Sequence, residues 1–472
     1  ISGIEGSVSE ILDSKSIPEY PLLVKAAAGG GGKGMRIVYK KEELEPALIA
    51  CSREAKNYFG DGAVFVEKYL TNPRHIEVQI IGDSFGNVIH LFERECSIQR
   101  RYQKIIEESP ASILSDDIRK SICNDAVKIA KAANYLRAGT IEFLLDSNEK
   151  YYFIEMNTRV QVEHPVTELV TGVDIVAEQI KIADGQKLSY EQPDIKQNLH
   201  AIECRIYAED SENNFMPSPG KMCFYQEPQN EFTRIDSSII DASEIKSSFD
   251  PMISKVITHG KNRQDALSNM QLALSDYHIH GIKTNIQFLK SILSDELFIN
   301  NRISTKFCES VFLPNYNPTS ETLKKIEEMV IAGLLYSLKA TRKAKNIWEE
   351  IGYWRVISRI PALFNNAEYE IEISDIEHNN FLVTLAGEIF DVELLSIIRN
   401  KIIIGLNKKE YEFVVSNNSD GKIFISNHGK VSTFERNDIL RENYKIISND
   451  DDDTDTVLKS IMPGKVIKII IS

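Results

Sequence analysis

Long apolar runs, paired cysteines and an excess of basic charge are all missing from this sequence of 472 residues. No apolar segment is long enough to span a bilayer as a helix, so we expect no membrane partner. The six cysteines include no Cys-x-x-Cys pair, which favours reduced core thiols in a cytoplasmic or mitochondrial matrix protein. Lys and Arg number 55 against 69 Asp and Glu, for a net charge of −14, and this argues against nucleic acid as a partner.

The rest of the composition is that of an ordinary globular protein. Hydrophobic residues make up 42% of the chain and charged residues 26%, and the length favours two to four domains. The sequence begins at Ile1 and stops inside a β-rich run, Val466–Ile471. We therefore expect a piece of a longer chain, whose missing N-terminus would hold any targeting segment.

A hairpin with acidic residues is the most informative local feature. Residues 139–145 and 151–157 are rich in β-branched and aromatic residues, and a two-residue turn at Asn148-Glu149 would join them. Antiparallel pairing about that turn places residues opposite each other when their numbers add up to 297. Glu142 is then predicted to face Glu155 directly.

Facing carboxylates repel each other, so the pair needs compensation. Side chains alternate along a strand, which puts Glu155, Asn157 and Arg159 on one face and Ile154 and Met156 on the other. Oxygen ligands from two Glu and one Asn suit Mg²⁺ or Mn²⁺. The alternative interpretation is a solvated acidic face on an ordinary hairpin.

Two further stretches indicate anion binding. A buried strand ends at Lys25 and leads into a glycine-rich segment that begins at Gly29, where backbone amides could approach phosphates closely; a plain glycine linker is the alternative. Arg100, Arg101 and Lys104 place three cations within five residues. They predict a local phosphate or carboxylate site, with a solvated basic turn as the alternative.

The C-terminal part has a different character. We expect an antiparallel sheet over 198–258, a helix over 321–338 and, at 355–448, a small antiparallel barrel indicated by dense strand and turn signals. The helix has more apolar surface than one domain normally buries. That surface predicts either a partner protein or a helix that fills the adjoining barrel.

The motifs KAAAGGGGKGM, EKYLTNPRHIEVQI, QRRYQK, GTIEFL, FIEMNTRVQVEHPVTE, CRIYAED and PSPGK follow one another from residue 1 to about 310. In this order they resemble biotin carboxylase of the ATP-grasp superfamily, and the closing SIMPGKV is similar to the opening of a biotinyl domain. The layout resembles the α subunit of a biotin-dependent acyl-CoA carboxylase of the propionyl or 3-methylcrotonyl kind, truncated at both ends.

The resemblance implies an α+β fold made of several parts. They are an ATP-grasp lid (1–70), an ATP-grasp catalytic subdomain (71–190), a biotin carboxylase C-terminal domain with an antiparallel sheet (191–315), a helix and β-barrel for subunit interaction (316–448), an acidic linker (449–456) and the start of a biotinyl domain (457–472).

The resemblance also assigns roles to individual residues. The metal positions are Glu142, Glu155 and Asn157. Nucleotide contacts are Lys25, Gly29, Gly30, Gly31, Gly32, Glu67, Lys68, Leu70, His75 and Leu144. The bicarbonate pocket comprises Lys104, Arg159 and Val162, with Glu163 as the base that deprotonates bicarbonate and Arg234 beside the biotin ureido group. Tyr102 departs from the family pattern, which has His two residues before the bicarbonate lysine.

The function implied is carboxylation of biotin by ATP and bicarbonate through carboxyphosphate, for transfer to an acyl-CoA. The implied cofactors are ATP, Mg²⁺ or Mn²⁺, and biotin, whose attachment lysine lies beyond this sequence. The implied partners are a carboxyltransferase β subunit, a biotinyl domain and further copies in an oligomer. Acetyl-CoA carboxylase, pyruvate carboxylase, carbamoyl-phosphate synthetase and a non-catalytic nucleotide-binding scaffold are the alternatives.

Overall fold

A computed structural model describes residues 1, 3–27, 35–239, 243–317, 326–339, 358–377 and 379–437. The glycines of the expected phosphate loop, the acidic linker and the start of the biotinyl domain lie outside the described residues. The chain forms two compact units, and we describe each by itself. The first comprises 1–204, 257–267 and 294–316, and the second the remainder. Among the described residues no helix is long and apolar enough to cross a membrane.

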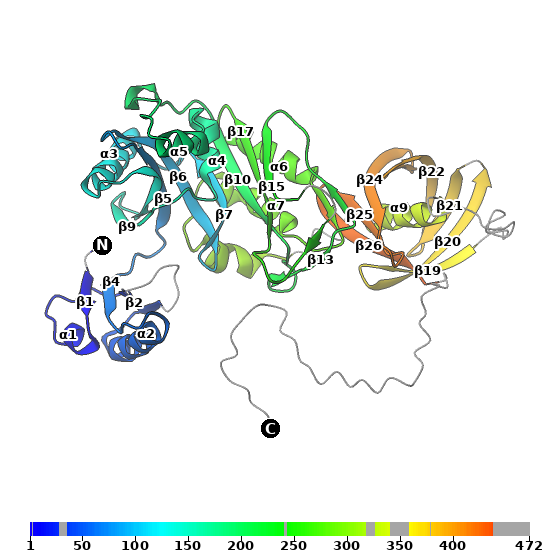
Figure 1. The fold of residues 1–472 in the computed structure, drawn as a ribbon. Coiled ribbons are helices and arrows are strands. Elements are labelled where there is room, and N and C mark those ends of the chain that lie inside the picture. Colours follow the sequence, from blue (N-terminus) through cyan, green and yellow to red (C-terminus); the bar gives the residue numbers. More distant parts are fainter. Residues whose placement is uncertain are drawn as a thin grey trace, which may run out of the picture. The chain divides into compact units, whose positions relative to one another are not determined.

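The first unit begins with a small sheet of strand order β1-β4-β2-β3, which packs against two helices (Figure 1). The strands are β1 (Gly3–Gly6), β2 (Leu22–Ala26), β3 (Arg36–Val38) and β4 (Val64–Lys68), and the helices are α1 (Val8–Leu12) and α2 (Leu44–Phe59). Helix α2 ends at Gly60, whose φ of 79° lies in the left-handed region that favours glycine.

A larger sheet follows, and its strands in this unit are ordered β10-β7-β6-β5-β8-β9. They are β5 (Arg74–Gly82), β6 (Val88–Arg100), β7 (Gln103–Ser109), β8 (Arg137–Leu145), β9 (Tyr151–Asn157) and β10 (His200–Tyr207). Its helices are α3 (Asp116–Ala132), α4 (His164–Thr171), α5 (Ile175–Ala183) and α8 (Glu296–Ile299). Apolar residues of α3 form a core with residues of β5 and β8, which leaves the other side chains of those strands for a polar face.

The β8–β9 hairpin confirms one register prediction and corrects another. Glu142 lies directly opposite Glu155, as predicted. Nearer the turn the register differs by one residue, because Phe143 lies opposite Phe153 and Ile154 is the extra residue of a β-bulge. The predicted two-residue turn is therefore wrong. The backbone N–H of Asp146 donates to Lys150 O at 2.9 Å, so the loop has three residues, and the bulge restores the predicted pairing at the acidic residues.

The second unit contains short strands and a closed barrel. The strands before the barrel are β11 (Glu209–Asp210), β12 (Met216–Pro217), β13 (Gly220–Lys221), β14 (Phe224–Gln226), β15 (Thr233–Ser237), β16 (Glu244–Ile245), β17 (Met252–Gly260) and β18 (His278–His280), with helices α6 (Arg263–Ser275) and α7 (Ile286–Leu293). The division between the two units falls within β17 and α6. The barrel strands are β19 (Ser358–Phe364), β20 (Ala367–Glu377), β21 (Asn380–Leu385), β22 (Glu388–Ile398), β23 (Lys401–Leu406), β24 (Lys409–Asn417), β25 (Ile423–Asn427) and β26 (Lys430–Arg436).

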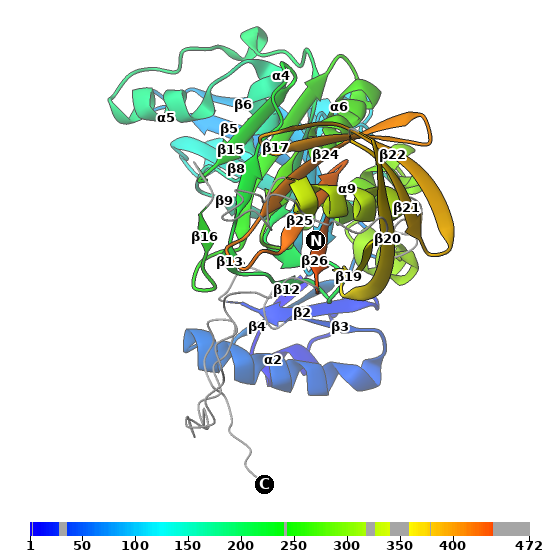
Figure 2. The ribbon, with the colours of Figure 1, turned by 90° about the vertical axis from the view of Figure 1, so that its right-hand side faces the viewer.

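Helix α9 (Ile326–Lys339) lies within this barrel, as Figure 2 shows. Val330, Ile331 and Leu334 are fully buried in one core with the barrel strands. A Cβ atom on Gly333 would lie 2.7 Å from the side chains of Ile425 and Phe434, so only glycine fits there. The antiparallel barrel is confirmed. Of the two interpretations of its apolar surface, the helix that fills the adjoining barrel is confirmed, and this surface is not a partner-binding face because the barrel buries it.

A histidine–serine network connects β18 to the barrel wall. His278 Nδ1 lies 2.8 Å from Ser426 Oγ, and His280 contacts Ser416 Oγ at 2.8 Å and Ser426 Oγ at 2.9 Å. Burial lowers the pKa of His278 to about 4. The pKa of His280 is lowered to about 3, mainly by burial and to a smaller extent by the neighbouring His278. Both rings are therefore neutral at physiological pH.

Candidate active site

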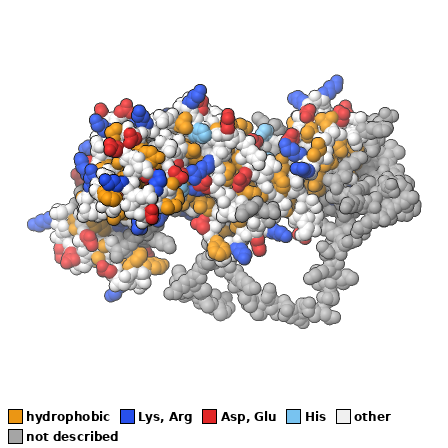
Figure 3. Space-filling view, turned by 45° about the horizontal axis from the view of Figure 1, so that its top comes forward, with side chains coloured by type: hydrophobic (Ala, Val, Ile, Leu, Met, Phe, Trp, Pro, Cys, Tyr) orange, Lys and Arg blue, Asp and Glu red, His pale blue; other side chains and the backbone are white. Residues whose placement is uncertain are grey.

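The charges that matter most are inside the first unit. Lys and Arg side chains alternate with Asp and Glu over the described part of the surface in Figure 3. Below the surface, four charged residues lie opposite one another on neighbouring strands, in the order Arg94 (β6), Glu77 (β5), Glu142 (β8) and Glu155 (β9). The first three are buried and Glu155 is exposed. One face of the sheet thus presents three carboxylates in a row.

Lys104 on β7 joins this row to α4. Its Nζ atom lies 2.5 Å from Glu77 Oε2, 2.9 Å from Glu142 Oε1 and 2.7 Å from Glu163 Oε1. Burial lowers the pKa of Lys104, but Glu77 and the other carboxylates outweigh it, and the pKa is well above its usual value. The lysine is a permanent cation shared by three acids.

His75 on β5 and Leu144 on β8 lie directly opposite each other, two residues along their strands from Glu77 and Glu142. His75 Nε2 is 3.3 Å from Glu142 Oε2 and 3.5 Å from Glu77 Oε2. Burial and Lys104 lower the pKa of His75, but its contacts with Glu142 and Glu77 raise it by more. The ligand atoms of these three residues lie within 4.8 Å of one another.

Glu142 is the most fully engaged carboxylate. Its Oε1 accepts hydrogen bonds from Lys104, from Asn157 Nδ2 at 2.9 Å and from Gln161 Nε2 at 2.8 Å. Burial raises the pKa of Glu142, yet His75 and then Lys104 outweigh it and lower the pKa to about 2. Glu142 is therefore ionised at neutral pH. Because it is also buried, the alternative of a solvated acidic face is wrong for this residue.

The predicted metal positions fit a hard divalent cation. Glu142 and Glu155 face each other, and Asn157 donates to Glu142 through its amide nitrogen, which leaves its oxygen as a possible ligand. Carboxylate and amide oxygens are the donors that Mg²⁺ and Mn²⁺ prefer. The residues present thus match the group that the sequence predicted.

The expected bicarbonate pocket is assembled in part. Glu163 is buried, is the N-cap residue of α4 and contacts Lys104, while Val162 beside it is half-buried. Arg159 lies beyond the end of β9 and is exposed, with a hydrogen bond to Val160 O at 3.2 Å. The prediction that Arg159 belongs to the strand face of Glu155 is therefore wrong.

The three cations near residue 100 do not form one anion site. Arg100 lies opposite Gln103, and Gln99 lies opposite Lys104, so alternation places Arg100 and Lys104 on opposite faces of the β6–β7 ribbon. Arg101 and Tyr102 form the turn, with φ values of 50° and 65°. The prediction that these three cations form one local anion site is therefore wrong. Of the three, Lys104 contacts the carboxylates described above.

Two of the expected nucleotide contacts, Lys25 and Glu67, form an ion pair on the small sheet. Lys25 Nζ lies 2.8 Å from Glu67 Oε1 and 5.1 Å from the centre of the Phe65 ring. Lys68 is exposed and Leu70 is buried. The predicted contacts Gly29, Gly30, Gly31 and Gly32 lie outside the described residues.

Arg234 belongs to the second unit and is held by Asp236. Its Nε and Nη2 atoms contact the two carboxylate oxygens of Asp236 at 2.7 and 3.0 Å, and Lys255 Nζ contacts the same group at 3.1 Å. Burial raises the pKa of Asp236, but Arg234 and Lys255 lower it by more. Arg234 is thus fixed in direction on β15.

Sequence reasoning missed Glu77 and Gln161. Glu77 is two residues beyond His75 on the same strand and so shares its face, which is a signal that alternation could have supplied. Gln161 lies in a loop, where no periodicity indicates direction. Its contact with Glu142 depends on the path of the chain between β9 and α4.

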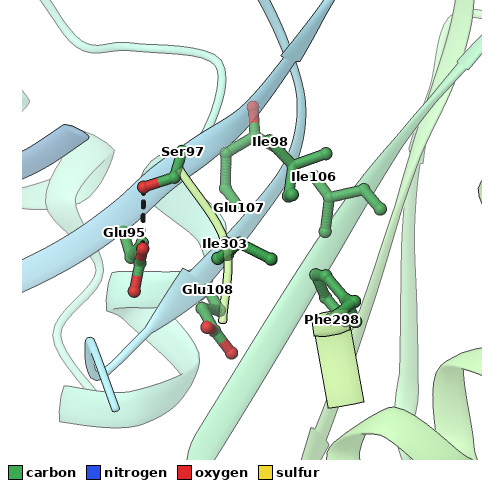
Figure 4. Close-up of a pocket in the computed structure, with 8 residues that line it drawn as sticks. All are labelled: Glu95, Ser97, Ile98, Ile106, Glu107, Glu108, Phe298 and Ile303. Atoms are coloured by element: carbon green, nitrogen blue, oxygen red, sulfur yellow. Dashed lines mark hydrogen bonds between the residues drawn. The ribbon is translucent and has the colours of Figure 1, made fainter. Parts of the chain in front are cut away.

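A small pocket lies beside the site, and Figure 4 shows its lining. Glu95 and Ser97 come from β6, Glu107 and Glu108 from β7, and Phe298 and Ile303 close the opposite side. Ser97 Oγ donates to Glu95 Oε1 at 2.7 Å and accepts from the backbone N–H of His75 at 3.1 Å. The pocket therefore supports the strand that carries His75 and includes none of the predicted site residues.

Comparison with known proteins agrees with this geometry. Residues 2–191 match the family model "Carbamoyl-phosphate synthase L chain, ATP binding domain", and residues 203–310 match "Biotin carboxylase C-terminal domain". One similar solved structure is the biotin carboxylase domain dimer of 2-oxoglutarate carboxylase from Hydrogenobacter thermophilus, in complex with MgADP, ADP and bicarbonate. Its sequence is 46% identical, and the match has a TM-score of 0.59 and covers 62% of this chain and 64% of that chain. Fold and site define an ATP-grasp protein.

Curated relatives narrow the class. Biotin carboxylase 1 of Bacillus subtilis is 47% identical over 66% of this chain and 70% of the relative. The mitochondrial methylcrotonoyl-CoA carboxylase subunit alpha of Dictyostelium discoideum is 35% identical over 100% of this chain and 69% of the relative. The propionyl-CoA carboxylase alpha chain of Sus scrofa is 41% identical over 84% of this chain, which spans only 54% of that relative. The chain belongs to the biotin carboxylase family.

Proposed function

We propose that this chain is the biotin carboxylase component of a biotin-dependent acyl-CoA carboxylase. The proposal rests on the contacts of Lys104, whose ammonium group is shared by Glu77, Glu142 and Glu163. One of these acids, Glu142, is also a member of the facing Glu142–Glu155 pair. A half-buried cation among carboxylates, next to oxygen ligands for a metal, suits a reaction between two anions, ATP and bicarbonate.

In this proposal Glu163 accepts the proton of bicarbonate, and Lys104 and Arg159 hold the anion near it. The bicarbonate oxygen then attacks the γ-phosphorus of ATP, and ADP leaves as carboxyphosphate forms. Lys25 binds the phosphates, Glu67 orients Lys25, and His75, Leu144 and Leu70 contact the nucleotide. Mg²⁺ or Mn²⁺ on Glu142, Glu155 and Asn157 would neutralise charge on the phosphates.

Carboxyphosphate releases CO₂ and phosphate, and the phosphate removes the ureido proton of biotin. Arg234 stabilises the resulting ureido anion, and its pairing with Asp236 keeps the guanidinium in one orientation. The nitrogen then attacks CO₂, which gives carboxylated biotin. The biotin belongs to a biotinyl domain, which the family supplies in the same or a separate chain.

Two features support an acyl-CoA rather than a 2-oxo acid as final acceptor. The methylcrotonoyl-CoA carboxylase alpha chain of Dictyostelium matches 100% of this chain, whereas a pyruvate carboxylase chain of Methanothermobacter thermautotrophicus, 46% identical, matches 70%. The match to the Dictyostelium chain includes the barrel that encloses α9. We propose that this barrel binds a carboxyltransferase β subunit in an oligomer of the cytoplasm or mitochondrial matrix.

The test is ATP hydrolysis by the full-length protein with and without bicarbonate and free biotin. We expect ADP release to require bicarbonate and Mg²⁺. With bicarbonate labelled at carbon, the label should appear in carboxylated biotin. ATP hydrolysis that is indifferent to bicarbonate would refute the proposal. Transfer from the carboxylated holoenzyme to propionyl-CoA, 3-methylcrotonyl-CoA, acetyl-CoA or pyruvate then identifies the acceptor.

A further inference from the structure

Arg94 is a fully buried arginine whose hydrogen bonds are all accounted for. A guanidinium has five N–H donors and no acceptor. In Arg94, Nε donates to Glu77 Oε1 at 2.6 Å; Nη1 donates to Gln79 Oε1 at 2.9 Å and Thr167 Oγ1 at 2.9 Å; and Nη2 donates to Thr140 Oγ1 at 3.2 Å and Gln161 Oε1 at 3.0 Å. Five donors meet five acceptors, and the side chain is 0% exposed.

These acceptors belong to parts of the chain that are distant in sequence. Glu77 and Gln79 are on β5, Thr140 is on β8, Gln161 precedes α4, and Thr167 is on α4. The planar guanidinium therefore joins the sheet that holds Glu142 to the segment that holds Glu163. A lysine could supply the charge but not five donors in fixed directions.

Arg94 also decides which way the Gln161 amide points. Because every polar atom of a guanidinium is a donor, the end of Gln161 that faces it must be the oxygen. The nitrogen then faces Glu142 Oε1, to which it donates at 2.8 Å. The same reasoning applies to Gln79, whose nitrogen donates to Gly139 O at 2.9 Å.

Charge compensation alone does not explain this arrangement. Glu77 already has Lys104 at 2.5 Å, and four of the five Arg94 hydrogen bonds go to neutral acceptors. One of those acceptors, Gln161, contacts the proposed metal ligand Glu142 with its other end. Arg94 and Glu142 are thus connected through a single amide.

We propose that Arg94 is a positioning residue that fixes the Gln161 amide as a donor to Glu142 and so aligns that carboxylate for the divalent cation. The inference deepens the proposed function at the same site. Groups that orient a metal ligand typically affect metal affinity or activity 10–100-fold when removed.

The experiment compares Arg94→Lys, Gln161→Leu and the double variant in the full-length protein, with two readouts. One is the affinity for Mn²⁺, measured without ATP. The other is the bicarbonate-dependent turnover of ATP. We expect each single variant to weaken Mn²⁺ binding and lower kcat by about 10–100-fold. The double variant should be little worse than either single one, because both break the same connection.

Arg119→Lys is the matched control. Arg119 also pairs with a buried glutamate of β6, Nε to Glu93 Oε1 at 2.8 Å, and donates to Ala111 O at 3.0 Å, but it contacts none of the site residues. It should lower the melting temperature about as much as Arg94→Lys and leave Mn²⁺ affinity and kcat unchanged.

The outcomes separate this inference from the proposed function. Unchanged Mn²⁺ affinity in Arg94→Lys, or losses that multiply in the double variant, would overturn it. If the wild type hydrolysed ATP without regard to bicarbonate while the Mn²⁺ results followed the expected pattern, the proposed function would fail and the positioning role would stand.

Discussion

Glu142 and Glu155 lie directly opposite each other on β8 and β9, although the register of the hairpin changes by one residue immediately beside them. Glu142 is buried and held by three donors, whereas Glu155 is exposed. For the proposed cation, Glu142 is therefore a ligand held in one orientation, whereas the exposed Glu155 is a ligand that can adjust its position.

Replacing Glu155 by Gln tests this pair. Because the side chain is exposed, we expect the melting temperature to change little. Loss of a direct ligand should lower Mg²⁺-dependent turnover by at least about 100-fold, more than removal of an orienting group. Glu149→Gln, in the exposed loop of the same hairpin, is the control and should keep full activity. Near-normal turnover in Glu155→Gln would mean that it is not a ligand.

Glu163→Gln tests the proposed base. Gln retains the size of the side chain and can still accept from Lys104, so the α4 N-terminus should keep its structure. Removal of a positioned base should lower turnover by roughly 10²–10⁴-fold with ATP affinity unchanged. Equilibrium binding of ATP is measured beside the rate. A loss of ATP affinity equal to the loss of rate would instead identify Glu163 as a nucleotide contact.

The neutral histidines of the second unit predict a pH dependence of stability. Burial depresses the pKa of His280 to about 3 in the folded chain, from an ordinary 6.5. The unfolded chain therefore binds more protons below pH 6.5, and the contribution of the network is complete above that pH and is lost as the pH falls toward about 3. Thermal unfolding followed from pH 8 to pH 4 should show this slope.

The matched variants for that experiment are His280→Gln and His259→Gln. The first removes the ring that contacts Ser416 and Ser426, so it should be less stable at pH 8 and lose less stability on acidification. The second changes a half-buried histidine outside the network and should keep the wild-type slope. Equal slopes in all three proteins would contradict the assignment.

Gly333→Val tests whether the barrel is needed for assembly. The new side chain would overlap Ile425 and Phe434, and overpacking of this kind costs about 1–3 kcal/mol. We expect the barrel to be destabilised and association with a carboxyltransferase β subunit to be lost in sedimentation, while carboxylation of free biotin continues. Gly405→Ala, in strand β23 where a Cβ atom would lie 3.5 Å from its nearest neighbour, is the control for glycine substitution in the barrel. Retained association in a demonstrably unfolded barrel would refute the role.

Local features of this protein follow from the sequence because their physics is local. The sequence pattern predicts a β8–β9 hairpin with Glu142 opposite Glu155, and turn residues at regular spacing predict an antiparallel barrel; the structure contains both. Even here the bulge at Ile154 was not predictable, since nothing in the residue order distinguishes a two-residue turn with a regular ladder from a three-residue loop with one extra residue.

The tertiary structure decided which partners these elements have. An apolar helix surface indicates that burial occurs but not what buries it, and only the fold shows that the barrel encloses α9. In the same way, the sequence marks Lys104 as a cation, while its contacts with Glu77, Glu142 and Glu163 depend on two strands and a helix N-terminus that are 27 to 59 residues away in sequence. The five acceptors of Arg94 also come from segments that only the fold brings together. The sequence determines the charge and the hydrogen-bonding capacity of each residue, whereas the tertiary structure determines the directions and distances between them.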